Sequence, residues 1–219
     1  KFENLVNHLL AKSSFGFKET RNLEETKESI EQNKKLSSEF IQKSAITRSE
    51  AFQAWENARR KENYQVFAPT LKKIVELERE KAEYLGYIKN PYDSLLNLYE
   101  KKLTVAKLEN IFKEVKQQIV PLIKQIKNQN QVDDSFLHQF FDKDKQFDFS
   151  IEVLKLMGYD FKAGRQDIST HPFTINFNAQ DVRVTTRINQ NDISEVIWST
   201  IHEGGHGLYE QGLLPNHYG

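Results

Sequence analysis

Apolar residues recur every three or four positions through most of the chain up to residue 157, which is the spacing of helices that bury one face. The segments that this spacing predicts as helices are residues 1–12, 64–85, 90–99, 104–128, 136–141 and 147–157. Residues 19–62 contain neither proline nor glycine, so they predict one long helix, or two helices that bend near residues 47–50.

Between residues 173 and 188 the pattern changes to an alternation of apolar and polar residues. The alternating positions are Phe173, Ile175 and Phe177 before a short turn, and Val182, Val184, Thr186 and Ile188 after it. Two such segments joined by a short turn are typical of a β-hairpin. A last helix is predicted over residues 192–212, begun by a capping box of Asp192 and Glu195 and ended at Gly212.

These elements predict a mostly α-helical protein: a helical bundle with long N-terminal helices, a small β-hairpin or sheet near residues 165–190, and one further helix. We expect a helical N-terminal region over residues 1–163, a hairpin region over residues 164–190, and a helix with its following loop over residues 191–219.

Composition excludes several classes of partner. Lysine plus arginine and aspartate plus glutamate both number 31 among 219 residues, so no basic field favours nucleic acid or an anionic membrane surface. There is no cysteine, which rules out disulfides and thiolate metal ligands within the sequence and fits a cytoplasmic location. No apolar run approaches the roughly 20 residues that span a bilayer, and the N-terminal residues lack the long apolar core of a signal peptide.

The strongest chemical signal is His202-Glu203-Gly204-Gly205-His206, an H-E-x-x-H pattern inside the last predicted helix. Residues four apart share a helix face, so both imidazoles reach one metal ion, and Glu203 reaches a water beside it. The glycines disfavour a helix by about 1 kcal/mol each relative to alanine. They make sense if a substrate backbone or a second helix approaches closely. The alternative is a buried helix that carries two hydrogen-bonded histidines.

The predicted hairpin adds candidates for substrate binding. One strand face carries Asp181, Arg183, Thr185 and Arg187. Arg183 and Arg187 could grip a peptide carboxylate with paired hydrogen bonds, and Asp181 could hold an arginine in place. His171, held extended by Pro172, could donate to a carbonyl or an oxyanion. The alternatives are an ordinary solvated strand face and an ordinary hydrogen-bonded turn histidine.

Three motifs follow one another: H-P-F at 171–173, D-V-R-V-T at 181–185, and H-E-G-G-H at 202–206. With the flanking G-R-Q-D-I-S-T and G-L-Y-E-Q-G-L-L-P, this trio resembles the Taq-type, or thermostable, metallocarboxypeptidase family. The resemblance implies mostly helical homodimers that use zinc, or cobalt, to release residues one at a time from peptides with a free C-terminus.

Carried over by motif, the resemblance implies that His202 and His206 are metal ligands and that Glu203 is the general base. His171, Asp181, Arg183 and Thr185 become candidates for shaping the substrate end of a groove. The family's third ligand, a glutamate on a later helix, is expected beyond Gly219. The resemblance therefore implies that residues 1–163, 164–190 and 191–219 are parts of one catalytic domain that is incomplete at residue 219. We therefore expect the 219-residue chain to bind metal weakly and to have little peptidase activity.

Other routes to a third ligand are less favourable. Glu210 lies a rise of about 12 Å along the helix from His202, too far to share one ion. His217, on the following loop, remains an alternative. Two other functions also stay open: a related zinc endopeptidase, and a non-enzymatic helical interaction module that works through residues 19–62.

Overall fold

A computed structural model describes residues 1–12 and 14–214. The chain forms two compact units, residues 1–129 and 130–219. Residues 130–163, expected in the N-terminal region, are therefore grouped with the sheet and the last helix. The expected division at residues 163 and 190 into parts of one catalytic domain stays a prediction. Among the described helices, none is long and apolar enough to cross a membrane.

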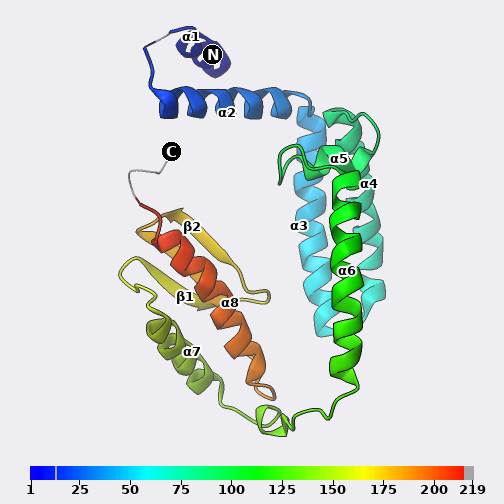
Figure 1. The fold of residues 1–219 in the computed structure, drawn as a ribbon, viewed down its shortest axis with the longest axis vertical. Coiled ribbons are helices and arrows are strands. Elements are labelled where there is room, and N and C mark those ends of the chain that lie inside the picture. The colour runs from blue at the N-terminus through cyan, green and yellow to red at the C-terminus, as the bar shows by residue number, and fades with distance from the viewer. Residues whose placement is uncertain (13, 215–219) are drawn as a thin grey trace. The chain divides into compact units, whose positions relative to one another are not determined.

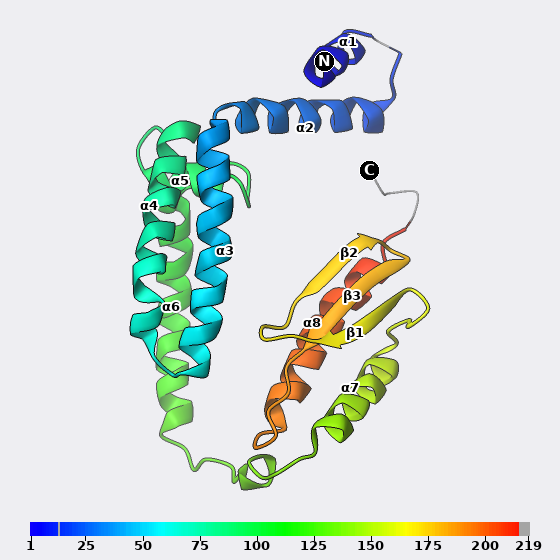
Figure 2. The same ribbon diagram turned by 180° about the vertical axis from the view of Figure 1, so that it is seen from behind.

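The first unit is built from helices (Figures 1 and 2). They are α1 (Phe2–Leu10), α2 (Phe17–Lys34), α3 (Ser38–Arg60), the 3₁₀ turn η1 (Tyr64–Val66), α4 (Ala68–Leu85), α5 (Pro91–Leu96) and α6 (Val105–Lys127). Helices α3 and α4 pack antiparallel, because the Phe40 ring near the start of α3 meets the Tyr84 ring near the end of α4 at 5.2 Å. Most of the predicted helix boundaries are confirmed within a few residues.

The long helix predicted over residues 19–62 is instead two helices, and the break lies at residues 35–37 rather than near residues 47–50. The Ser37 hydroxyl accepts a hydrogen bond from the Phe40 backbone N–H at 3.1 Å and so caps α3. Residues 47–50 lie inside α3, where Thr47 is buried. Because no proline or glycine marks the true break, the sequence pattern did not locate it.

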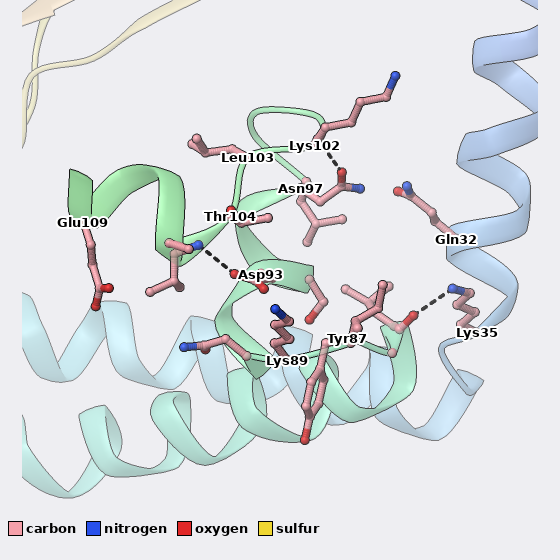
Figure 3. A pocket seen from close by; sticks show the side chains of 18 residues that line it. Gln32, Lys35, Tyr87, Lys89, Asp93, Asn97, Lys102, Leu103, Thr104 and Glu109 are labelled. Carbon is pink, nitrogen blue, oxygen red and sulfur yellow. Dashed lines mark hydrogen bonds between the residues drawn. The ribbon is translucent and has the colours of Figure 1, made fainter. Parts of the chain in front are cut away.

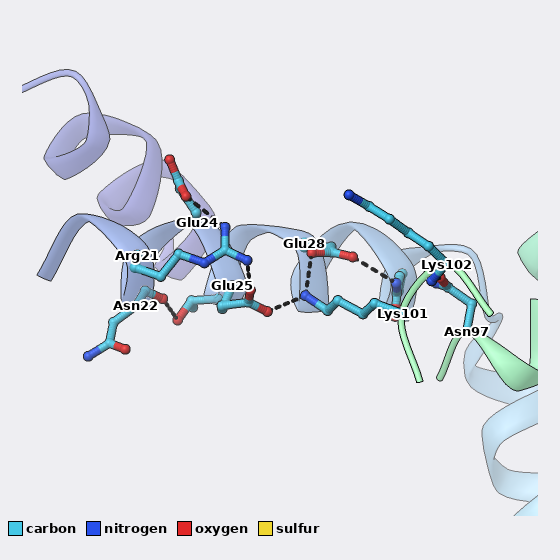
Figure 4. A network of polar contacts seen from close by, with 10 residues as sticks. Arg21, Asn22, Glu24, Glu25, Glu28, Asn97, Lys101 and Lys102 are labelled. Atoms are coloured by element: carbon cyan, nitrogen blue, oxygen red, sulfur yellow. Dashed lines mark hydrogen bonds and ion pairs between the residues drawn. The ribbon is translucent and has the colours of Figure 1, made fainter. Parts of the chain in front are cut away.

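A surface ion-pair network joins the loop after α5 to α2 (Figure 4). Lys101 donates to Glu28 at 2.7 Å and also to Glu25, and Arg21 pairs with Glu25 and with Glu24. Hydrogen bonds from Lys101 lower the pKa of Glu25. Exposed pairs of this kind each contribute little to stability, so the network adds little to the stability of the unit.

The second unit contains η2 (Ser135–Leu137), α7 (Lys143–Met157), β1 (Gly164–Ile168), β2 (Thr174–Asn178), β3 (Asp181–Thr186) and α8 (Ser194–Gln211). The sheet order is β1-β3-β2, with β1 parallel and β2 antiparallel to β3. Helix α8 covers one face of the sheet (Figures 1 and 2). The predicted mostly helical fold with a small sheet is confirmed.

Several details of this unit differ from the expectation. Strand β1 was not predicted, and the helix expected over residues 136–141 is the 3₁₀ turn η2. The capping box is wrong, because Asp192 accepts from the Ser194 N–H at 2.9 Å whereas Glu195 pairs with Arg187 at 2.6 Å. Helix α8 consequently begins at Ser194 without a side-chain cap.

A buried chain of hydrogen bonds fixes α8 against the sheet and α7. The Ser150 hydroxyl on α7 donates to Gln166 on β1 at 3.2 Å, and Gln166 donates to Thr200 on α8 at 3.4 Å. The Thr186 hydroxyl on β3 lies 3.1 Å from that of Thr200 and 2.7 Å from that of Ser199. Buried polar groups are costly unless satisfied, so this chain specifies one seating of α8 and with it the direction of its histidines.

Candidate metal centre

The two histidines of the H-E-x-x-H pattern lie one turn apart on α8. Their ring centroids are 4.9 Å apart with the ring planes at 85°, and both side chains are exposed. The opposite side of the helix packs on the sheet and α7, so the imidazoles point away from the core. Two adjacent, exposed imidazoles on one rigid element suit a divalent transition metal. Their role as ligands stays a prediction.

Glu203 lies between the two histidines in sequence but turns toward the sheet. It is only 7% exposed. The Thr174 hydroxyl on β2 donates to the Glu203 carboxylate at 2.7 Å, and the same oxygen lies 3.1 Å from the Glu203 carbonyl oxygen. Thr174 therefore fixes the side chain that we expect to act as the base. Sequence reasoning missed Thr174, although it directly follows the H-P-F motif.

The three glycines have different surroundings. A Cβ at Gly204 would lie 2.7 Å from Leu154 Cδ2 on α7, and one at Gly207 would lie 2.9 Å from Tyr159 Cε2. The expected close approach of a second helix is thus present at Gly204, and the core cluster approaches Gly207. A Cβ at Gly205 would meet nothing within 4 Å. Nothing in the described structure explains that glycine.

A cleft of about 510 Å³ runs beside the first histidine. Its lining residues are His171, Pro172, Trp198, Ser199, Ile201, His202 and Glu203. The structure thus brings the H-P-F segment and the H-E-x-x-H helix to one cleft, although His171 and His202 are 31 positions apart in sequence (202 − 171 = 31). Trp198, which is 68% exposed, forms an apolar wall that sequence reasoning did not single out.

The segment that carries His171 is held by Thr185. Because β1 and β2 flank β3 and run in opposite directions, residues 169–173 cross the end of β3. There the Thr185 hydroxyl accepts from the Phe173 N–H at 2.8 Å and lies 2.9 Å from the Ser169 hydroxyl. Thr185 is 7% exposed, so its observed contacts support the H-P-F segment. Direct substrate contact by Thr185 stays a prediction.

Asp181 and Arg183 are not brought to this cleft. Val184 and Thr186 face α8, so Arg183, which alternates with them on β3, faces the other way. Asp181 accepts two hydrogen bonds from Arg183, both at 2.8 Å, so Asp181 holds this arginine in place as expected. These bonds lower the pKa of Asp181 and raise that of Arg183. Their substrate-binding role stays a prediction.

The described residues bring together two candidate metal ligands and not three. Across residues 1–12 and 14–214, no group of three histidine, cysteine, aspartate or glutamate side chains is placed to hold an ion. Glu210 accepts a hydrogen bond from Asn176 at 2.6 Å, which agrees with its exclusion by spacing. His217 lies outside the described residues. Two adjacent imidazoles fit part of a metal site, and the third ligand stays a prediction.

A second cavity, of about 780 Å³, lies wholly within the first unit (Figure 3). Its polar groups are largely used in holding loops: Lys35 donates to the Leu85 carbonyl at 2.7 Å, and Asp93 accepts from the Val105 N–H at 2.7 Å. The backbone N–H of Lys102 donates to Asn97 at 2.9 Å. We find no catalytic grouping among these lining residues.

Comparison with known proteins decides the family. The sequence model of the Carboxypeptidase Taq (M32) metallopeptidase family matches residues 1–219. The chain belongs to this family. Among curated M32 relatives, Carboxypeptidase 1 of Bacillus subtilis (strain 168) is 41% identical over 192 residues, which is 87% of this chain and 38% of that protein. The metallopeptidase family implies a metal cofactor.

Solved M32 structures show the same fold. The M32 carboxypeptidase from Deinococcus radiodurans R1 superposes with a TM-score of 0.83 at 28% identity, over 98% of this chain and 43% of that chain. The Pyrococcus furiosus carboxypeptidase gives a TM-score of 0.78 at 34% identity, over 95% of this chain and 42% of that chain. The chain thus spans about two fifths of the length of the relatives it matches.

Proposed function

We propose that this chain carries part of the active site of a zinc metallocarboxypeptidase, with cobalt as the alternative metal. The observation that carries the proposal is the cleft that joins His171, His202 and Glu203, with His206 beside His202 at a ring separation of 4.9 Å. The family membership and the carboxypeptidase names of its relatives support the reaction class.

In this proposal His202 and His206 hold the metal together with a ligand from outside the described residues. A bound divalent metal would supply Lewis-acid polarisation of a carbonyl and a lower pKa for water. Glu203 takes a proton from the attacking water and passes it to the leaving amine. Thr174 keeps the Glu203 carboxylate in one orientation, because its hydroxyl donates at 2.7 Å. His171 donates a hydrogen bond to the substrate oxygen.

The proposed substrate is a peptide with a free C-terminal carboxylate. Trp198 and Ile201 give the cleft an apolar wall against which a side chain of the peptide packs. Strand β2 lies at one edge of the sheet, beside Glu203, and offers backbone groups to an extended peptide. Homodimer formation and a cytoplasmic location stay predictions that rest on the family resemblance and on composition.

The test uses this sequence in a polypeptide extended to the length of its relatives, and the 219-residue chain beside it. With zinc present, the extended polypeptide should release single residues from free peptides and leave C-terminally amidated peptides intact. Glu203→Gln should remove the activity, whereas His8→Ala, on α1, should not. Equal cleavage of free and amidated peptides would favour an endopeptidase. Robust hydrolysis by the 219-residue chain would contradict the expectation that its site is incomplete.

A further inference from the structure

Helix α6 carries a long apolar stripe that the described structure leaves exposed. Its six clearest members are Ile111, Phe112, Val115, Ile119, Leu122 and Ile123, each between 42% and 55% exposed. Positions spaced by three and four fall on one side of a helix, so these residues form a continuous surface of about three turns. No residue of α6 is buried. An apolar stripe of this length is typical of a helix that packs against another element.

The stability of α6 does not come from packing within the described chain. Its visible supports are at its first turn, where Thr104 accepts from the Lys107 N–H at 3.3 Å and Asp93 accepts from the Val105 N–H at 2.7 Å. Among the described elements, none packs broadly on α6. Helices draw most of their stability from burying an amphipathic face, so a 23-residue helix with this pattern implies a missing neighbour.

We propose that an acidic amphipathic helix covers this stripe, and that it comes from the part of the family's length that this chain does not span. The matched relatives are more than twice as long as this chain, which leaves ample sequence for such a helix. Five lysines against two glutamates give α6 a net charge of +3 (5 − 2 = 3), so a partner helix with flanking carboxylates is complementary. The inference does not depend on the proposed peptidase activity.

The chain offers a sharp test because it contains no cysteine. Single-cysteine variants Ile119→Cys and Val115→Cys place one thiol in the stripe, and Gln117→Cys places a matched control on the opposite side of α6. The rate of labelling by a maleimide reports the exposure of each thiol. Val115→Cys, the smaller change in volume, keeps the test valid if Ile119→Cys disturbs folding.

In the 219-residue chain at low concentration, stripe and control thiols should label at similar rates. In a polypeptide extended to the length of its relatives, the stripe thiols should label at least tenfold more slowly and the control should be unchanged, at every protein concentration. Fast labelling there would overturn the proposal. So would protection that rises with protein concentration, which indicates a second copy, or protection only with phosphatidylglycerol vesicles, which indicates a membrane surface. Protection already present in the dilute 219-residue chain would place the partner within this chain.

Discussion

Replacement by alanine is expected to have different effects on stability at two adjacent glycines of α8, Gly204 and Gly205. Replacing glycine by alanine inside a helix favours folding by about 0.8–1 kcal/mol, because the unfolded chain loses freedom and the helix gains a better former. At Gly205 the added Cβ meets nothing within 4 Å, so Gly205→Ala should raise the free energy of unfolding by about this amount. At Gly204 the Cβ would lie 2.7 Å from Leu154 Cδ2 and 2.9 Å from Met157 Cε.

Leu154 is fully buried, so it has little room to move. Overpacking a filled core costs about 1–3 kcal/mol. This cost offsets or exceeds the gain from the better helix former, so Gly204→Ala should leave the free energy of unfolding unchanged or lower it by up to about 2 kcal/mol. The two variants should differ by about 1–3 kcal/mol in the free energy of unfolding, which is the size of the overpacking term alone.

Urea denaturation, followed by tryptophan fluorescence, measures this difference. The sequence has two tryptophans, so a Trp55→Phe background leaves only Trp198, which lies on α8 itself. With a slope of about 1 kcal/mol per molar urea for a small unit, the midpoints should separate by about 1–3 M. Equal destabilisation by Gly204→Ala and Gly205→Ala would refute the seating of α8 on α7.

Two further substitutions test the second unit. Thr174→Val should lower the free energy of unfolding by about 2 kcal/mol, because the buried Glu203 carboxylate loses its hydroxyl donor. Thr174→Ser keeps a hydroxyl and should retain most of this stability in the same urea assay. Equal destabilisation by both variants would contradict the hydrogen bond. Burial raises the pKa of Tyr159 to about 12. Since the unfolded tyrosine releases its proton near pH 10 while the folded one keeps it, stability should fall by about 1–2 kcal/mol between pH 10 and 12. Denaturation midpoints across that range should fall by more for the wild type than for Tyr159→Phe, and an equal fall in both would contradict the burial of the Tyr159 hydroxyl.

The sequence pattern correctly predicted those helices and those parts of the candidate site that depend on residues close together in the chain. The H-E-x-x-H spacing on a helix needs only helical geometry to bring His202 and His206 together, and their rings lie 4.9 Å apart. On β3 the alternation matches burial, because Val182, Val184 and Thr186 are buried whereas Arg183 is exposed. On β2 the apolar Ile175 and Phe177 are exposed, and the polar Thr174 and Asn176 contact α8 instead. These features follow from residues close together in the chain.

The missed features depend on contacts that are distant in sequence. Strand β1 has few apolar residues to mark it as a buried strand. Its central residue, Gln166, is buried, and hydrogen bonds to Ser150 and Thr200 satisfy its polar side chain. Thr174 matters only because β2 lies beside Glu203. Arg183 was placed with the site by motif, whereas the register of β3 turns it to the other face of the sheet.

In the proposed function, His202 and His206 hold one divalent metal together. The most direct measurement follows the ¹⁵N shifts of the imidazole nitrogens of the 219-residue chain during a zinc titration. Both histidines should shift together, with an end point of one zinc per chain and a weak affinity, and either His202→Ala or His206→Ala should abolish the response of the other. Shifts in only one of them, or equal shifts at His8 and His138, would contradict the claim.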